Sequence, residues 1–340
     1  MFSKLIIAAL AIFATAELAS AQTATRDKFL KMIDRPRVAL NPEASKLSEA
    51  GGKASWHFTF AAEAGQRVPG ILVKKASPAG RRPAVIVLSG TGGTKEDMAE
   101  YLEVLADRGF VGVSIDGRYH GERSKLGVGS DEYVDAMLRT YRTGKELPFL
   151  YDTVWDLLRL IDYLNTREDV DPARIGMIGF SKGGMETYLT AAVDPRVAVA
   201  VPMIGVQSFR WAIENDSWHS RVGTFQAAIN GAAKDAGAQV NADFVRKFYD
   251  RVVPGIYSDF DGPEMVPLIA PRPLLSIHGD SDPRTPRPGV ELAAARAMEA
   301  YGKAGAKDKF RLLWQENTGH MVRPAYLQQG FDWLSTWLKP

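Results

Sequence analysis

The chain has 340 residues, 46% of them hydrophobic, which is enough for one large domain or two small ones with a substantial buried core. Its 42 lysine and arginine residues nearly balance its 40 aspartate and glutamate residues, without a basic block or tail, which argues against a nucleic-acid-binding protein. Cysteine is absent, which excludes disulfides, thiolate metal sites and an N-terminal cysteine that carries a lipid anchor.

Residues 1–21 have the pattern of a secretory signal peptide. Lys4 gives a positive start, residues 5–16 are apolar, and Ala19-Ser20-Ala21 supplies the small residues that precede a cleavage site. The apolar run is shorter than the ~20 residues that a helix needs to cross a bilayer. We therefore expect cleavage near Ala21-Gln22 and an exported chain, periplasmic or secreted, without a stable membrane anchor.

The next segments predict an N-terminal arm and a β-hairpin. Residues 22–54 are polar and are broken by Gly51-Gly52, so we expect an arm with one short helix at most. Residues 55–60 alternate between apolar and polar, and residues 68–73 do so less regularly, which is typical of two antiparallel strands. The main domain is expected to cover residues 55–340.

A parallel βαβ unit follows the hairpin. Residues 84–88 and 110–115 are short apolar runs that predict buried strands, and residues 96–108 between them predict an amphipathic helix. The glycine-rich stretch Ser89-Gly90-Thr91-Gly92-Gly93 leaves the first strand. Its glycines allow close approach to a ligand, and the Thr91 N–H is a candidate donor to an oxyanion.

A polar loop over residues 116–123 leaves the second strand of this unit. Ligands in open α/β sheets bind beyond the carboxyl ends of the strands, so this loop is a candidate wall of a binding site. Arg118 and Tyr119 are its predicted substrate-binding residues.

The strongest motif lies at residues 174–184. Its apolar first part predicts a buried strand, Gly179-Phe180-Ser181-Lys182-Gly183 has the form Gly-x-Ser-x-Gly, and a helix-forming stretch follows. Strand, motif and helix in this order place the serine on a sharp turn above the sheet, at the positive end of a helix. Ser181 is the predicted nucleophile, and the Lys182 N–H is the second candidate oxyanion donor. Helices are also predicted over residues 131–144 and 150–166.

Residues 206–267 interrupt the alternation of strands and helices after a strand at residues 197–201. This insertion is rich in aromatic residues and lies next to the predicted turn. Its sequence fits a lid over a pocket as well as it fits a structural brace. Trp211 and His219 are its predicted substrate-binding residues.

The remainder of the chain offers partners for the serine. Strands are predicted at residues 273–277 and 310–314, and helices at 289–302 and 326–338. A serine hydroxyl needs a histidine as base and an acid that orients it. His320 is the predicted base because it lies in the loop that leaves the last strand, whereas His278 is expected to brace its own loop. Asp282 is the preferred acid, and Asp280 is the alternative.

These motifs and their order resemble the α/β-hydrolase superfamily. Ser89-Gly90-Thr91-Gly92-Gly93 and residues 117–123 look like its dienelactone-hydrolase and acetyl-esterase-like branch. The resemblance implies an α/β fold with a mostly parallel central sheet flanked by helices, a Ser-Asp-His triad, and neither a cofactor nor a metal. The chain departs from the branch at Ser89, where the family often has histidine, and at Ser181, where dienelactone hydrolases have cysteine.

The expected function is therefore that of an exported serine hydrolase that cleaves small-molecule carboxylic esters through an acyl-enzyme. One alternative is a prolyl-oligopeptidase-like peptidase, which shares the triad order but usually carries a large N-terminal propeller. A second alternative is a non-catalytic binding protein on a hydrolase scaffold. The sequence leaves the oligomeric state open.

Overall fold

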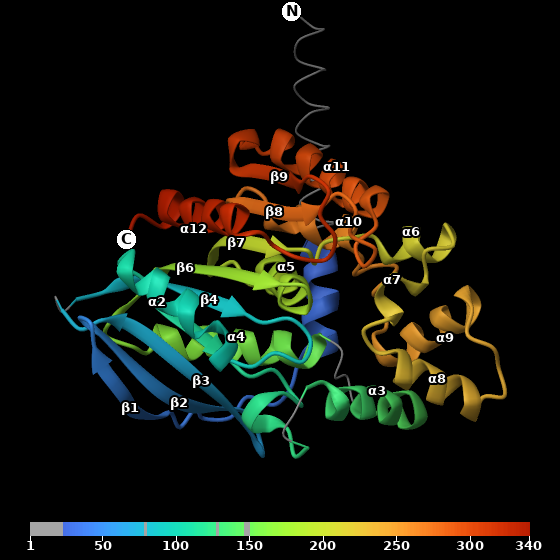
Figure 1. Ribbon diagram of the computed structural model, residues 1–340, viewed down its shortest axis with the longest axis horizontal. Helices are drawn as coiled ribbons and strands as arrows, with labels where there is room; N and C mark the ends of the chain where they lie inside the picture. The colour runs from blue at the N-terminus through green and yellow to red at the C-terminus, as the bar shows by residue number, and fades with distance from the viewer. Residues whose placement is uncertain (1–22, 78–79, 127–128, 146–149) are drawn as a thin grey trace, which may run out of the picture.

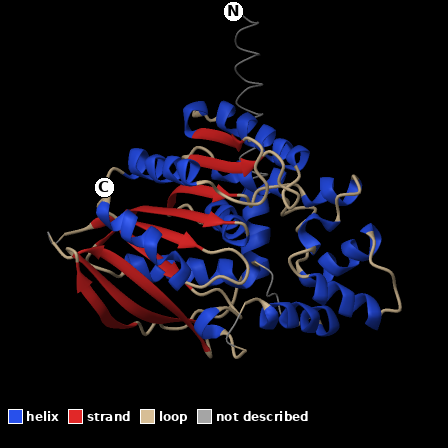
Figure 2. Cartoon of the chain, in the orientation of Figure 1, coloured by secondary structure: helices blue, strands red, loops and turns tan. Residues whose placement is uncertain are grey.

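A computed structural model describes residues 23–77, 80–126, 129–145 and 150–340. A nine-stranded sheet in the order β1-β2-β3-β5-β4-β6-β7-β8-β9 forms its centre, and helices cover both faces (Figures 1 and 2). The predicted signal peptide, residues 1–21, lies outside the described residues.

The first part of the sheet is antiparallel. The strands β2 (Lys53–Glu63) and β3 (Gln66–Lys75) form the predicted hairpin, which turns at Gly65 with a φ of 74°. The expected arm is more ordered than its sequence indicated, because it contains a helix over residues 23–33 and the edge strand β1 (Glu43–Ala50), paired with β2. Every residue of β1 is exposed, so the strand has no apolar alternation by which its sequence could reveal it.

The second part of the sheet is parallel, as predicted. β5 joins it to the hairpin by pairing antiparallel with β3, and every pairing from β5 to β9 is parallel. Its strands are β4 (Arg82–Leu88), β5 (Val111–Ile115), β6 (Val170–Phe180), β7 (Val197–Met203), β8 (Leu274–Gly279) and β9 (Phe310–Gln315). Most of these strands are buried along most of their length, because helices cover both faces of the sheet. Their carboxyl ends therefore meet at one edge.

Two helical layers enclose the sheet. One contains α2 (Ala99–Asp107) and α12 (Pro324–Leu338), whose apolar side chains pack with those of β4, β6 and β7. The other contains α4 (Tyr151–Asn165), α5 (Lys182–Val193) and α11 (Arg287–Lys303), which share the larger core with the strands. The remaining elements before and after the insertion are η1 (Glu96–Met98), η2 (Gly121–Arg123), α3 (Asp131–Thr143) and η4 (Lys307–Lys309). All helices among the described residues are too short or too polar to span a membrane.

Most of the insertion forms a helical group beyond the carboxyl ends of the parallel strands, at the right of Figure 1 and next to α3, whereas its last two elements pack against α11. Its elements are α6 (Phe209–Glu214), α7 (His219–Val222), α8 (Gln226–Asp235), α9 (Ala242–Val252), α10 (Gly262–Met265) and η3 (Val266–Ile269). Six of its aromatic side chains are buried in the same core as α4 and α5: Phe209, Phe225, Phe244, Phe248, Tyr249 and Phe260. Most of the aromatic content of the insertion thus serves packing.

Candidate active site

The turn between β6 and α5 holds Ser181 in a strained conformation, with φ 53° and ψ −109°. Few residues other than glycine adopt a positive φ, and such strain persists where the surroundings enforce it. The neighbouring glycines are required, because a Cβ on Gly179 would collide with the Gly183 carbonyl and one on Gly183 with the Leu88 carbonyl. Strand, turn and helix therefore pack too closely for larger residues, and Ser181 is presented at the carboxyl edge of the sheet.

The structure brings Ser181, His320 and Asp282 into one hydrogen-bonded line. The Nε2 atom of His320 lies 2.7 Å from the Ser181 Oγ, and its Nδ1 lies 2.7 Å from the Asp282 Oδ2. The three residues follow β6, β9 and β8, whose carboxyl ends meet at the same edge. Since the ionised Asp282 can only accept from Nδ1–H, the neutral imidazole presents Nε2 as an acceptor to the serine hydroxyl.

The ionisation of the two titratable groups suits this arrangement. Burial opposes the charge of Asp282, but hydrogen bonds from His320, from the Thr285 hydroxyl and from the Arg284 N–H lower its pKa to about 2. Burial lowers the pKa of His320; its hydrogen bond to Asp282 raises it, and the positive charges of Arg221 and Arg284 lower it further. The result at neutral pH is a neutral imidazole beside a permanent carboxylate.

The alternative base and acid have other partners. His278 is completely buried within β8, its Nε2 lies 2.9 Å from the Ser276 Oγ, and burial lowers its pKa to about 3. Its hydrogen-bond partner is thus in its own strand and not in the loop that it was expected to brace. Asp280 accepts hydrogen bonds from the N–H groups of Asn317 and Thr318, at 3.0 and 3.2 Å, and so holds the loop that carries His320.

The backbone N–H groups that could bind an oxyanion lie at the start of α5 and in the loop after β4. Lys182 is the first residue of α5, so its N–H has no acceptor within the helix. The Gly183 N–H donates to the Ser89 carbonyl at 3.1 Å, and a Cβ on Gly90 would lie 3.7 Å from the Ser181 Cβ. Thr91 follows in the turn that the Gly93 N–H closes onto the Gly90 carbonyl. The two candidate oxyanion donors therefore belong to the start of α5 and to the loop after β4, two segments that are hydrogen-bonded to each other next to the serine.

The side chain of Lys182 is buried, which the motif did not reveal. Its Nζ pairs with the Glu186 carboxylate at 2.6 Å, and burial raises the pKa of Glu186 although Lys182 opposes the shift. A Cβ on Gly117 would lie 3.1 Å from this Nζ, so the lysine fills the space beneath the loop after β5. The i,i+4 spacing of Lys182 and Glu186 was the available signal in the sequence.

Arg118 lies among carboxylates beneath the loop after β5. Its side chain is buried, and the guanidinium lies near three carboxylates, at 2.6 Å from Glu63, 3.1 Å from Asp156 and 3.6 Å from Asp152. Burial opposes its charge, yet these carboxylates raise its pKa above the usual value. This side chain joins β2, α4 and the loop, and a substrate-binding Arg118 stays a prediction. Neighbouring Tyr119 is half-buried against the core, with the Arg139 guanidinium 5.7 Å from its ring centre.

The two predicted residues of the insertion lie in different helices, α6 and α7. Trp211 lines a cavity of about 210 Å³ between α6, α10 and α11, together with Ser208, Asp261 and Leu292. His219 is exposed at the start of α7, with its ring 5.7 Å from that of Trp218. The lining of the Trp211 cavity includes no member of the serine, histidine and aspartate line.

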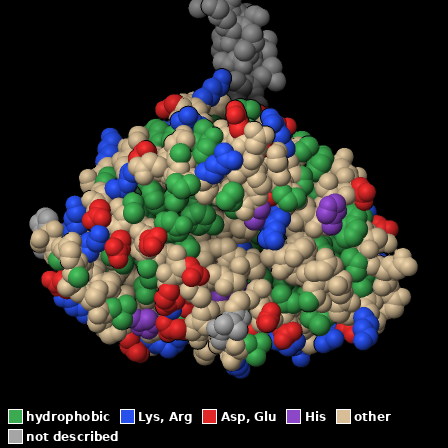
Figure 3. Space-filling view, in the orientation of Figure 1, with side chains coloured by type: hydrophobic (Ala, Val, Ile, Leu, Met, Phe, Trp, Pro, Cys, Tyr) green, Lys and Arg blue, Asp and Glu red, His purple; other side chains and the backbone are tan. Residues whose placement is uncertain are grey.

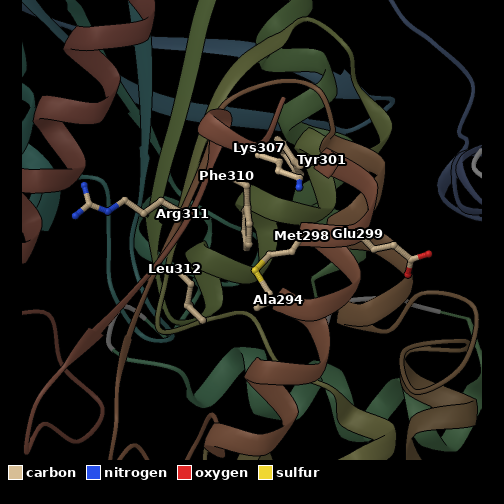
Figure 4. Close-up of a pocket in the computed structure, with 8 residues that line it drawn as sticks. All are labelled: Ala294, Met298, Glu299, Tyr301, Lys307, Phe310, Arg311 and Leu312. Atoms are coloured by element: carbon tan, nitrogen blue, oxygen red, sulfur yellow. The ribbon is translucent and has the colours of Figure 1, made fainter. Parts of the chain in front are cut away.

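A larger cavity, of about 600 Å³, lies between α11 and the edge strand β9. Figure 4 shows Met298 and Phe310 turned toward each other across it, while Arg311 points away to the other face of the strand. Its lining is likewise free of the Ser181, Asp282 and His320 side chains.

Basic and acidic side chains are interspersed over the face in Figure 3, with no large patch of one sign.

The described residues contain no group of three or more His, Asp or Glu side chains arranged to hold a metal ion.

Comparison with known proteins connects this geometry to a family. A family model described as acetyl xylan esterase (AXE1) matches residues 32–220. The protein YtaP of Bacillus subtilis (strain 168), described as a hydrolase, is 28% identical over 286 residues, which cover 80% of this chain and 84% of YtaP.

Solved esterase structures share the fold. The acetyl xylan esterase from Paenibacillus sp. R4 superposes with a TM-score of 0.63 at 17% identity, over 93% of this chain and 92% of that one. The glucuronoyl esterase from Solibacter usitatus superposes with a TM-score of 0.61 at 16% identity, over 92% of this chain and 91% of that one. At such identities the likeness establishes the α/β-hydrolase fold, in agreement with the resemblance seen in the sequence motifs.

Proposed function

The chain belongs to the acetyl xylan esterase (AXE1) family, and from that membership and the geometry at Ser181 we propose that it is an exported serine esterase. Its proposed substrates are small carboxylic esters, with acetylated carbohydrates as the class that the family suggests. The observation that carries the mechanism is the line of two 2.7 Å contacts from Ser181 through His320 to Asp282.

In the acylation half of the proposed reaction, the Ser181 Oγ attacks the ester carbonyl carbon while His320 Nε2 takes the hydroxyl proton. The C=O electron pair moves onto the oxygen, and the N–H groups of Lys182 and Thr91 stabilise that oxyanion. As the oxyanion collapses, the bond to the alcohol oxygen breaks, and His320 gives its proton to the leaving alcohol. Ser181 then carries the acyl group as an ester.

Water completes the cycle by the same steps. His320 takes a proton from a water molecule, whose oxygen attacks the acyl carbonyl. Collapse of the second oxyanion breaks the bond to Ser181, the Oγ recovers a proton from His320, and the carboxylic acid leaves. Asp282 keeps its charge throughout, because it orients the imidazole and stabilises the imidazolium that forms in both halves.

Two further parts of the proposal concern the organisation of the chain. Residues 1–21 are proposed to be removed on export, so that the mature chain begins near Gln22, and intact-mass measurement of the exported protein checks this. Residues 55–340 are proposed as the hydrolase domain, in which residues 206–267 form a lid-like insertion over the edge that carries Ser181.

The serine is tested by Ser181→Ala. Because the acyl-enzyme requires the serine oxygen, we expect kcat on p-nitrophenyl acetate to fall by about 10⁶-fold, with folding unchanged in a thermal melt. A fluorophosphonate probe should label the parent and not the variant. Failure of the parent to react with the probe would exclude an activated serine, and preferential cleavage of proline anilides would identify a peptidase instead.

A further inference from the structure

Arg221, in the short helix α7 of the insertion, is a buried cation with unusual partners. Its side chain is 2% exposed, and its Nη2 donates to the carbonyl oxygens of Ile204 and Gly205, at 3.3 and 3.2 Å. Within the part of the chain that the structure describes, no carboxylate oxygen lies within 4.0 Å of its guanidinium nitrogens. Burial of a cation without a paired carboxylate costs desolvation free energy, so other interactions of Arg221 must offset that cost.

The carbonyls that Arg221 contacts belong to the segment that supports the nucleophile. This segment leaves β7, where the Met203 carbonyl accepts a hydrogen bond from the Ser181 N–H at 2.9 Å. The next turn packs directly behind the serine, because a Cβ on Gly205 would lie 2.8 Å from the Ser181 carbonyl oxygen. Arg221 thus ties the insertion to the backbone against which the strained turn rests.

A second connection leads from Arg221 to the acid. The buried amide of Gln207, in the orientation that satisfies both its groups, accepts a hydrogen bond from the Arg221 Nε at 3.2 Å and donates one to the Arg284 carbonyl at 2.8 Å. The N–H of Arg284 in turn donates to the Asp282 Oδ1 at 2.8 Å. One guanidinium therefore joins the segment behind Ser181 to the loop that holds Asp282.

The charge of Arg221 acts on the same groups. Burial lowers the pKa of Arg221 to about 10, against the favourable charge of Asp282, so the side chain remains cationic at neutral pH. That positive charge adds to burial in lowering the pKa of His320 and of the neighbouring His278. The phenol rings of Tyr188 and Tyr249, also buried, complete the surroundings of the guanidinium.

From these contacts we propose that Arg221 is a positioning residue of the esterase site, which holds together the turn that carries Ser181 and the loop that carries Asp282. This inference rests on the proposed role of His320 as the base. Ser181 and Asp282 contact His320, the charges of Arg284 from the loop after β8 and of Arg221 from the insertion act on it, and His320 in turn acts on His278 in β8. The charge of Asp282 favours the imidazolium, whereas the charges of Arg221 and Arg284 oppose it, so loss of Arg221 removes a force that opposes protonation.

The test compares Arg221→Gln with Arg221→Lys, since both retain an N–H donor for the Ile204 and Gly205 carbonyls and only the first removes the charge. The pH dependence of kcat/KM for p-nitrophenyl acetate is measured for both variants and the parent, because its acidic midpoint reports the base of the free enzyme. We expect the midpoint to rise by about one pH unit in Arg221→Gln, because a positive charge that opposes protonation of His320 is lost. It should stay near the parent value in Arg221→Lys. Equal midpoints in the two folded variants would overturn the electrostatic role.

A second variant keeps the proposal testable if Arg221→Gln does not fold. Gln207→Met removes the link to the Arg284 carbonyl but leaves the charge of Arg221 in place. We expect kcat to fall by about tenfold with an unchanged acidic midpoint, and a folded Gln207→Met with the kcat of the parent would show that the two loops are not coupled through this path. Labelling of the parent by the fluorophosphonate probe separates these outcomes from failure of the proposed function itself.

Discussion

The loops that leave β6, β8 and β9 differ from the insertion of residues 206–267 in how they reach the candidate site. Each of these loops places one side chain of the proposed triad directly at the carboxyl edge of the sheet. Contacts of 2.7 Å join His320 to Ser181 and to Asp282. The insertion contributes mainly buried aromatic side chains and the cation Arg221, which touches backbone carbonyls and not the reacting groups. The first region positions atoms through the sheet itself. The second does so through packing and, at Arg221, through hydrogen bonds to the backbone.

This difference determines how each region responds to mutation. In the loops after β6, β8 and β9, the proposed triad side chains take part in the reaction directly. A conservative substitution of one of them should therefore remove activity and leave the fold intact. A residue that acts through packing should change stability first. The following predictions test this division, from the largest expected effect to the smallest.

Asp282 and Asp280 give the sharpest contrast within the strand-end loops. Asp282→Asn retains the size of the side chain but removes the charge that orients and stabilises the imidazole, so we expect kcat on p-nitrophenyl acetate to fall by as much as ~10⁴-fold with an unchanged melting temperature. Asp280→Asn should cost less than about tenfold in kcat, because the Asp280 carboxylate bonds the N–H groups of Asn317 and Thr318, one with each oxygen, and not the imidazole of His320. The amide oxygen replaces only one of these two acceptors. The reverse order of the two variants would mean that Asp280 is the acid of the triad.

The sequence revealed the strand-end residues because chain order and sheet topology constrain them. Buried parallel strands appear in the sequence as apolar runs, and their carboxyl ends lie at the same edge of the sheet. A Gly-x-Ser-x-Gly turn between a strand and a helix places Ser181 at that edge, and Asp282 and His320 follow later strands that end there. The sequence did not reveal β1, whose exposed residues lack periodicity, or Arg221, whose environment depends on Ile204, Gly205 and Gln207. Contacts between distant segments cannot be predicted from the local sequence when neither segment has a periodic pattern of apolar residues.

Arg118 also lies in a strand-end loop, but its contacts are those of a buried group of ion pairs. Its guanidinium is buried among Glu63, Asp152 and Asp156, so Arg118→Leu leaves charged groups without a partner. We expect a loss of about 3 kcal/mol in the free energy of unfolding, measured by denaturation in urea, with KM for p-nitrophenyl acetate unchanged. Arg37→Leu is the control, since Arg37 is 59% exposed and its pair with Asp162 should contribute about 0.5 kcal/mol at most. A folded Arg118→Leu with normal stability and a raised KM would support the substrate-binding role.

Trp211 is the corresponding test in the insertion, with the smallest expected effect. Its ring lies in a cavity with Ser208, Asp261 and Leu292 and approaches Gly289 of α11, so the contacts in the structure are those of a brace between α6 and α11. Because the side chain is half-buried, Trp211→Ala should cost about 1–2 kcal/mol, less than a fully buried aromatic residue, and lower the melting temperature by a few degrees.

The decisive measurement for Trp211 is a ratio. The ratio of kcat/KM for a short and a long p-nitrophenyl acyl ester reports differential binding of their transition states. If the insertion acts at this position only through packing, both rate constants change together and the ratio stays that of the parent. A ratio altered by tenfold or more in Trp211→Ala, with the melting temperature unchanged, would place this side chain against the acyl chain. The insertion would then share the direct mode of action of the strand-end loops, and the division between the two regions would fail at Trp211.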